Sequence, residues 1–286
     1  MTFTGGVDVG STYTKAVILR EDGRIAAKTM VATGFRLAEA ATCAFEDAVA
    51  AAGTSEHEIA YVVSTGLGRY QVPFRDTQVT ELTANARGAR HFFPSTRTLL
   101  DVGAQTMKSS RLDERGKVKA FRLTDKCAAG TGAFLETTAR YLGYEIDEIG
   151  PLTATSKEPV AIFAACAVFA ESEVINHVSS GRAPADIMHG AIVSLADRSV
   201  QLMKRTGIEA EITLVGGIMR FETMVRVMRE ELKTAVNVPP GALAQYTGAI
   251  GAALLAQRRL EKRCGEAGID ESSRAACSGS AAGFSR

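Results

Sequence analysis

The sequence has almost no net charge and no long apolar run, and each of these shortages argues against a class of partner. Its 33 lysines and arginines nearly balance its 32 aspartates and glutamates, so the formal net charge is only +1. A nucleic-acid-binding surface normally needs a clear excess of positive charge. Charged residues, glycine or serine interrupt every apolar run before it reaches membrane-spanning length, and no secretory signal is visible at the start. We therefore expect a cytoplasmic protein without a nucleic-acid or membrane partner.

Cysteine and histidine are also scarce, and the few that occur are scattered. Five cysteines in a chain of this kind do not indicate structural disulfides. None of the four histidines lies beside another histidine or a cysteine, which argues against a histidine-based metal site. We expect Cys43 on the apolar face of its helix, and Cys264 and Cys277 in a C-terminal tail. The Walker A pattern G-x-x-x-x-G-K-S/T is absent as well, which excludes a P-loop protein.

What the sequence does contain is one segment that occurs twice. Residues 7–25 align without a gap to residues 100–118, and seven of the nineteen positions are identical. Each copy predicts a strand, a tight polar turn, a second strand and a further turn. Glycine lets the backbone approach a ligand, and the amides of a turn can face an anion, so two such hairpins predict a phosphate site with carboxylates that hold Mg²⁺. The repeated turn residues are Asp8 and Asp101, and Gly10 and Gly103.

Strand and helix patterns alternate along the chain, which predicts an α/β protein of two domains. We place the first domain at residues 1–95 and the second at residues 96–246. A last helix over residues 247–263 is expected to pack back on the first domain. Residues 264–286, rich in serine, alanine and glycine, are expected to be disordered. The other expected elements are helices at about 37–53, 80–91, 131–142, 167–180 and 184–206, and strands at about 59–64, 97–102 and 212–215.

Three glycine-containing turns follow predicted strands in a fixed order. They are D-V-G-S-T at residues 8–12, D-V-G-A-Q-T at residues 101–106 and V-G-G at residues 215–217. Any one of them alone is best explained as an ordinary structural turn. The ordered set, followed by a helix rich in glycine and alanine, resembles the actin/sugar-kinase/Hsp70-like ATPase fold. That resemblance implies two ribonuclease-H-like domains with a nucleotide in the cleft between them.

The resemblance also implies roles for individual residues. Asp8 or Asp101 would serve Mg²⁺ or the attacking water, Gln105 would orient that water, and Gly216-Gly217 would line adenosine. The other residues expected to contact ATP or ADP are Gly10, Ser11, Thr12, Lys15, Gly103, Gly130, Thr131, Gly132 and Gln245.

Two of these roles have equally ordinary alternatives. Lys15 and its repeat counterpart Lys108 fit solvated strand lysines as well as phosphate ligands, and Gln245 fits a residue that caps the last helix. Arg69, which follows a G-x-G turn, is better explained as structural.

Two cysteines each precede a predicted helix, where the helix dipole favours a thiolate. Cys127 lies in C-A-A-G-T-G and Cys166 in C-A-V-F-A-E-S. Two thiolates are half of a four-cysteine cluster, although small buried residues are the more ordinary interpretation of free cysteines. The motifs are similar to those of the BadF/BadG/BcrA/BcrD ATPase family, which includes activators of 2-hydroxyacyl-CoA dehydratases and ATPase subunits of benzoyl-CoA reductases. The resemblance implies that Cys127 and Cys166 from each of two subunits hold one 4Fe-4S cluster.

The choice between the two branches of this family rests on weaker signals. The runs at residues 84–90 and 134–150 look more like the reductase subunits. We therefore expect an ATP-hydrolysing electron-transfer subunit of an ATP-dependent benzoyl-CoA reductase. Its partners would be a homologous ATPase subunit or a second copy of itself, acyl-CoA-binding subunits and a ferredoxin-like electron donor. The alternatives are a homodimeric activator of a 2-hydroxyacyl-CoA dehydratase and, more remotely, a small-molecule kinase of the same fold.

Overall fold

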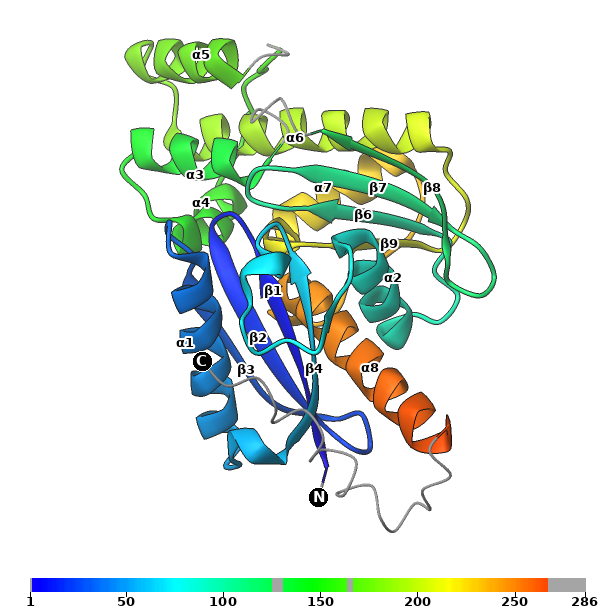
Figure 1. The fold of residues 1–286 in the computed structure, drawn as a ribbon. Coiled ribbons are helices and arrows are strands. Elements are labelled where there is room, and N and C mark those ends of the chain that lie inside the picture. The colour runs from blue at the N-terminus through cyan, green and yellow to red at the C-terminus, as the bar shows by residue number, and fades with distance from the viewer. Residues whose placement is uncertain (1, 125–130, 164–166, 267–286) are drawn as a thin grey trace. The chain divides into compact units, whose positions relative to one another are not determined.

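The computed structural model describes residues 2–124, 131–163 and 167–266. The chain divides into two compact units (Figure 1). One is built from Met1–Phe92 and the chain from Tyr246 onward, and the other from Phe93–Gln245. Within the described residues, no helix is both long and apolar enough to cross a membrane.

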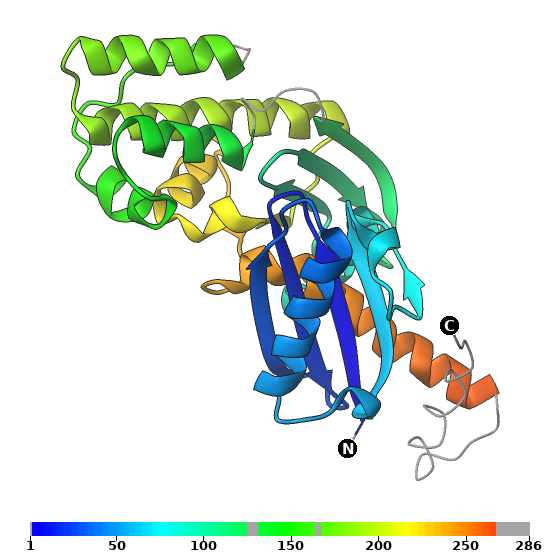
Figure 2. The ribbon, with the colours of Figure 1, turned by 60° about the vertical axis from the view of Figure 1, so that its left-hand side comes forward.

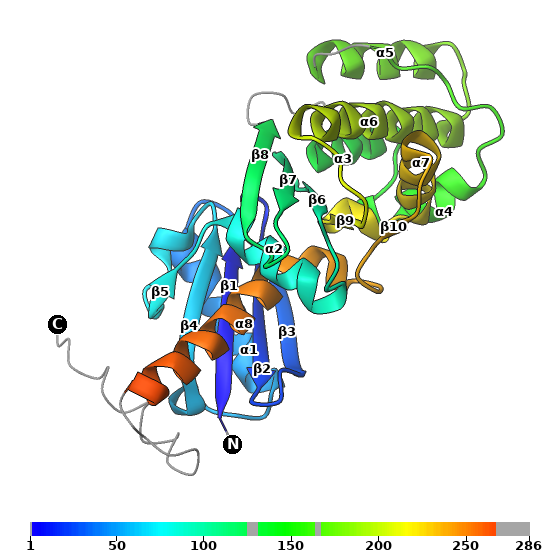
Figure 3. The ribbon, with the colours of Figure 1, turned by 90° about the vertical axis from the view of Figure 1, so that its right-hand side faces the viewer.

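The first unit is a five-stranded sheet with helices on both faces, in the strand order β3-β2-β1-β4-β5. Its strands are β1 Phe3–Val9, β2 Tyr13–Arg20, β3 Ile25–Ala32, β4 Ile59–Gly66 and β5 Thr77–Gln78. One face packs on α1 (Leu37–Ala51), as Figure 2 shows. The other face packs on α8 (Leu243–Glu266), beside α2 (Glu81–Phe92), as Figure 3 shows. Because side chains alternate along a strand, Val7 and Val9 enter the α1 core while Asp8 lies on the α8 face.

The second unit has the same strand arrangement, in the order β8-β7-β6-β9-β10. Its strands are β6 Thr98–Val102, β7 Met107–Leu112, β8 Val118–Thr124, β9 Ile212–Val215 and β10 Val236–Asn237. Its helices are α3 Gly132–Tyr141, α4 Ile149–Ala154, α5 Ala167–Ser179, α6 Pro184–Thr206 and α7 Glu222–Leu232. Short 3₁₀ turns occupy Glu56–Glu58, Arg69–Gln71, Ile146–Glu148 and Gly217–Arg220. Helix α6 is the centre of a large core shared with α3, α4, α7 and the sheet, and α5 lies outermost along α3 and α6.

The repeat seen in the sequence is one part of a longer structural repeat. Asp8 pairs with Lys15 of β2 and with Thr65 of the parallel strand β4. Asp101 pairs in the same way with Lys108 of β7 and with Val215 of the parallel strand β9.

The next residues after these parallel partners, Gly66 and Gly216, are therefore equivalent. Both have positive φ, 92° and 103°, and a Cβ on either would overlap the carbonyl oxygen of the valine after the aspartate, Val9 or Val102. An ungapped comparison cannot find this pair, because the helices α3 to α6 separate the second hairpin from β9.

Two expectations about cysteines are wrong. Cys43 is exposed, because the buried face of α1 is formed by residues on either side of it in the helical repeat, such as Ala40, Ala44 and Ala48. Cys264 is helical and buried rather than part of a tail. The reason is that α8 runs to Glu266, so the apolar stripe through Leu260 continues one turn further.

Candidate functional site

The carboxylate of Asp8 stands at the end of β1, paired with a lysine across the hairpin. Lys15 Nζ lies 3.5 Å from Asp8 Oδ2, and each side chain is only 17% exposed. The pair follows from the antiparallel register, which places Asp8 directly opposite Lys15. The turn beyond it is closed by the Gly10 amide, which donates to the Tyr13 carbonyl at 3.2 Å. A Cβ on Gly10 would lie 2.8 Å from that carbonyl oxygen, so the turn requires glycine.

The second hairpin reproduces this arrangement. Lys108 Nζ lies 4.0 Å from Asp101 Oδ2, with side-chain exposures of 15% and 16%, and it also donates to Thr106 Oγ1 at 2.8 Å. The Gly103 amide donates to the Thr106 carbonyl at 2.9 Å. Lys15 and Lys108 are therefore shielded, ion-paired lysines, and the alternative of a solvated strand lysine is wrong for both.

The turn of the second hairpin is bonded directly to the start of α3. Gly132 N–H donates to the Gly103 carbonyl at 3.0 Å, and Ala133 N–H donates to the Ala104 carbonyl at 2.8 Å. The first amides of a helix have no partner within the helix, so here the turn satisfies two of them. Thr131, the N-cap residue, is fully buried. The turn and the first turn of α3 are thus linked directly by two backbone hydrogen bonds.

The Gly-Gly turn after β9 meets the start of α8. Gly216 N–H donates to the Ala244 carbonyl at 2.9 Å, and the position of a Cβ on Gly217 lies 3.7 Å from Gln245 Oε1. Gln245 lies inside the first turn of α8 rather than before it. The structure therefore brings together Gly216, Gly217 and Gln245.

The remaining predicted contacts are less constrained. Gln105 is exposed in the β6–β7 turn, while Ser11 and Thr12 are half-buried in the β1–β2 turn. Gly130, Cys127 and Cys166 lie outside the described residues.

Sequence reasoning missed three residues around Asp8. A Cβ on Gly66 would lie 2.6 Å from Asp8 Oδ1, and a Cβ on Gly248 would lie 3.2 Å from Asp8 Oδ2 and equally 3.2 Å from Asn85 Oδ1. The G-x-G at residues 66–68 is weak in isolation, Asn85 lies in the run at residues 84–90, and Gly248 lies in the last helix rich in glycine and alanine. None of these patterns indicates a place beside Asp8, to which Asn85 and Gly248 are brought by helix packing.

The segment before Cys166 is held by side chains of two helices. Asp186 of α6 accepts hydrogen bonds from Ser156 Oγ and from the amides of Lys157 and Glu158, at 2.8 to 2.9 Å. These bonds, that of Glu158 first, lower the pKa of the Asp186 carboxyl.

Closer to Cys166, Glu173 of α5 accepts the Phe163 amide at 2.8 Å, and His177 Nε2 lies 3.2 Å from the Ala161 carbonyl oxygen. The chain on both sides of Cys166 is therefore tied together, because Phe163 precedes the cysteine and Glu173 follows it. Phe163 and Phe169 are 86% and 67% exposed.

The described residues do not contain a ready-made cluster of metal-binding side chains. No group of three or more histidine, cysteine, aspartate or glutamate side chains in the described chain is arranged to hold an ion. Loss of hydration and the nearby Asp47 carboxylate raise the pKa of the Cys43 thiol, whose Sγ lies 3.7 Å from Asp47 Oδ2. Cys43 is thus a poor thiolate ligand.

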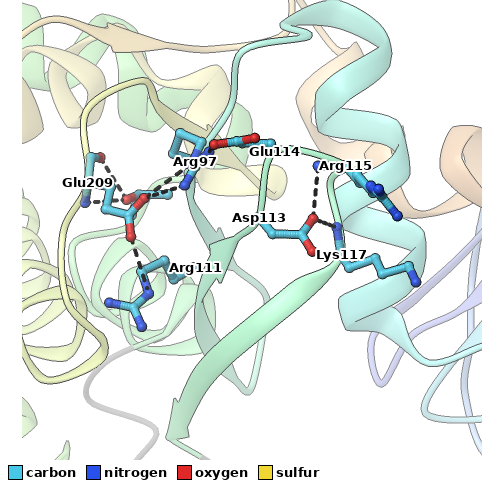
Figure 4. Close-up of polar contacts among 8 residues, drawn as sticks. Arg97, Arg111, Asp113, Glu114, Arg115, Lys117 and Glu209 are labelled. Carbon is cyan, nitrogen blue, oxygen red and sulfur yellow. Dashed lines mark hydrogen bonds and ion pairs between the residues drawn. The ribbon is translucent and has the colours of Figure 1, made fainter.

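A salt-bridge network lies at the end of the second sheet that is away from Asp101 (Figure 4). Arg97 at the start of β6 donates to Glu209 Oε2 from Nε and Nη2 at 3.1 and 2.9 Å, and Arg111 Nε lies 3.4 Å from Glu209 Oε1. In the β7–β8 turn, Asp113 Oδ1 accepts the amides of Lys117 and Arg115, which lowers the pKa of its carboxyl. These contacts anchor the hairpin at the end away from Asp101.

The repeated strand order is that of the actin/sugar-kinase/Hsp70-like ATPase fold. A ROK family glucokinase from Streptomyces griseus shares this fold, with a TM-score of 0.55 at 16% identity over 90% of this chain and 99% of that chain. The activator of the 2-hydroxyisocaproyl-CoA dehydratase from Clostridium difficile, solved with bound ADPNP, is far more similar. Its TM-score is 0.88 at 36% identity, over 94% of this chain and 99% of that chain.

The chain belongs to the BadF/BadG/BcrA/BcrD ATPase family, whose model matches residues 6–256. The activator of lactoyl-CoA dehydratase of Anaerotignum propionicum is 39% identical over 91% of this chain and 100% of that protein. A subunit of the benzoyl-CoA reductase of Thauera aromatica is 36% identical over 92% of this chain and 95% of that protein. The family and fold class predicted from the sequence are confirmed. The relatives support the activator alternative better than the reductase subunit that the sequence had favoured.

Proposed function

We propose that the protein is an ATP-hydrolysing activator that passes an electron to an acyl-CoA dehydratase. The observation that carries this proposal is the pair of hydrogen bonds from the start of α3 to the turn at Gly103 and Ala104. That turn is the proposed phosphate site, and the chain that enters α3 contains Cys127. The similarity to two dehydratase activators, at 39% and 36% identity, supports the same function.

In this proposal, both hairpins take part in binding the nucleotide. The amides of the turns after β1 and β6 would face phosphate oxygens, and Asp8 and Asp101 would serve Mg²⁺ or the attacking water. Carboxylate oxygens are ligands that a hard cation prefers. Gly216, Gly217 and Gln245 would line the adenosine, and Gln105, exposed in its turn, would orient water. Lys15 and Lys108 would balance the phosphate charge.

The cysteines fit an iron–sulfur cluster by their chemistry. Thiolates are the usual ligands of a 4Fe-4S cluster. Cys166 directly precedes α5, whose N-terminal end favours a thiolate, and Cys127 lies five residues before the start of α3. When bound, such a cluster supplies a single low-potential electron. One chain offers two of these thiolates, so the proposal requires a second copy of the chain. The exposed Phe163 and Phe169, which flank Cys166, suit a surface that another subunit covers.

The reductase subunit is the second candidate, supported by the 36% identity to its counterpart in the Thauera aromatica benzoyl-CoA reductase. It differs from the activator in its assembly, because it would remain bound to a second, homologous ATPase subunit and to acyl-CoA-binding subunits. A ferredoxin-like donor would serve either protein. The likeness to glucokinase, at 16% identity, concerns the fold alone.

The test is an iron and nucleotide assay on anaerobically purified protein. We expect a homodimer that contains about four irons per two chains and hydrolyses ATP. Cys127→Ala and Cys166→Ala should lose the iron, whereas the control Cys43→Ala should keep it. After reduction, the wild-type protein should activate an acyl-CoA dehydratase only when ATP is added. An iron-free dimer, or a monomer that carries a complete cluster, would contradict the proposal.

A further inference from the structure

The helix that carries Asn85 is packed unusually close to α8. A Cβ on Gly251 of α8 would overlap the Ala84 carbonyl oxygen, and a Cβ on Gly88 of α2 would overlap the Thr247 carbonyl oxygen. Glycines at these two positions let the backbones of α2 and α8 touch. The side chain of Asn85, one residue after Ala84, is therefore fixed against α8, and Asn85 is only 9% exposed.

Asn85 and Asp8 both lie close to the backbone of Gly248. A Cβ on Gly248 would lie 3.2 Å from Asn85 Oδ1 and 3.2 Å from Asp8 Oδ2, and a Cβ on Gly66 would lie 2.6 Å from Asp8 Oδ1. The two glycines therefore let the backbone approach Asp8 closely, and the side-chain oxygen of Asn85 lies beside the same point of Gly248 as that carboxylate.

Asn85 is the polar residue among the buried residues of α2, which are otherwise alanine and glycine. Asparagine is a weaker helix former than alanine, so its place in this helix depends on what its side chain contacts. Ala89, one turn further along the same face of α2 and fully buried, shows that this face accepts a small apolar side chain. A residue that departs from local preference in this way is typical of a functional site.

We propose that Asn85 is a binding residue for the divalent cation of the nucleotide, which it contacts together with Asp8, directly or through one water. The inference rests on the proposed function, since the cation would enter with ATP or ADP. Amide and carboxylate oxygens are both suitable ligands for a hard cation. The ammonium group of Lys15 lies 3.5 Å from Asp8 Oδ2 and partly neutralises that carboxylate, which weakens its attraction for a divalent cation. Asn85 adds an oxygen ligand without adding charge.

The experiment compares Asn85→Leu, which keeps the volume and removes the oxygen, with Asn85→Asp, which keeps an oxygen. Asn176→Leu, an identical change at an exposed position of α5, is the matched control. Binding of Mn²⁺ to each protein is measured by electron paramagnetic resonance of the free ion in the presence of ADP. Binding of ADP is measured separately in the presence of a chelator.

We expect Asn85→Leu to weaken Mn²⁺ binding in the ADP complex roughly tenfold or more, with ADP binding in the chelator unchanged. Asn85→Asp should bind Mn²⁺ at least as tightly as the wild type. The control Asn176→Leu should bind Mn²⁺ with the affinity of the wild type. If Asn85→Leu does not fold, Gly248→Ala takes its place, because a methyl group there separates the two oxygens. Gly265→Ala, with open space around it in the same helix, is then the control.

Two failures can be told apart. Wild-type protein that binds neither ADP nor Mn²⁺ with ADP would overturn the proposed function itself. Wild-type protein that binds both, with Asn85→Leu or Gly248→Ala binding Mn²⁺ equally well, would overturn the role of Asn85 alone.

Discussion

The two hairpin carboxylates have matching partners but different neighbours. Asp8 faces Lys15 and lies between two glycines, whereas Asp101 faces a lysine that is also bonded to its own turn. Lys108 reaches Thr106 at 2.8 Å as well as Asp101 at 4.0 Å. In the proposed site, a phosphate at this turn competes with both contacts of Lys108, so this lysine links phosphate binding to the state of Asp101.

Lys108→Met should therefore lower the rate of ATP hydrolysis roughly 10- to 100-fold, because it removes a cation from the proposed transition-state site. Lys119→Met, on the exposed side of the neighbouring strand β8, is the control and should hydrolyse ATP at the wild-type rate. Steady-state hydrolysis by the two variants and the wild type measures the difference. Equal rates in all three proteins would show that Lys108 is only structural.

His189 predicts a pH dependence of stability. Burial, followed by the charge of Arg226 at 3.4 Å, lowers its pKa in the folded protein below the ordinary value of 6.5. The unfolded chain therefore takes up a proton first as the pH falls, and the free energy of unfolding should decrease below about pH 6.5. We expect urea unfolding to show a smaller loss of stability between pH 7.5 and pH 5.5 for His189→Gln than for the wild type. Parallel losses in the two proteins would contradict this assignment.

At the level of elements, the sequence predicted local patterns well and helix contacts poorly. The repeat at residues 7–25 and 100–118 and the strand at residues 212–215 lie within one or two elements, and the structure contains both. The strands β5 and β10 are two residues long, too short for any periodicity. The edge strand β8 is exposed over most of its length, so its pattern does not alternate cleanly. Asn85 and Gly248 meet only because α2 and α8 cross, which no local pattern encodes.

The crossing of α2 and α8 depends on glycine at a particular point. Gly251→Ala would place a methyl group on the Ala84 carbonyl, so it should lower the free energy of unfolding by about 1–3 kcal/mol. Gly265→Ala in the same helix, with open space around it, should leave stability unchanged or raise it by up to about 1 kcal/mol. Denaturant titrations of both variants provide the comparison. A Gly251→Ala protein as stable as the wild type would show that the two helices can move apart without cost.

At the scale of the whole molecule, the repeat in the sequence corresponds to a repeat of the strand arrangement in the two units. Both units have the same strand order, one carboxylate turn and one glycine with positive φ at the end of the parallel strand, Gly66 or Gly216. The sequence revealed the hairpins because they repeat without a gap, but the long helical insertion hid the second half of the repeat. The two units differ in this insertion, which is present in the second unit and contains α3 and α5, the helices that follow Cys127 and Cys166 in the sequence. We infer that the duplicated part of the chain binds the nucleotide and that the inserted part connects nucleotide binding to electron transfer.

The most direct test of this account is the electron paramagnetic resonance spectrum of the reduced protein in different nucleotide states. If the turn at Gly103 and Ala104 moves α3 when phosphate binds, the surroundings of Cys127 must depend on the nucleotide, because a ligand that favours neither state shifts nothing. The protein is purified anaerobically, reduced, and examined with ADP and with a non-hydrolysable ATP analogue. The account predicts clearly different cluster spectra for the two nucleotides. Identical spectra with both nucleotides bound would contradict the coupling between ATP hydrolysis and electron transfer.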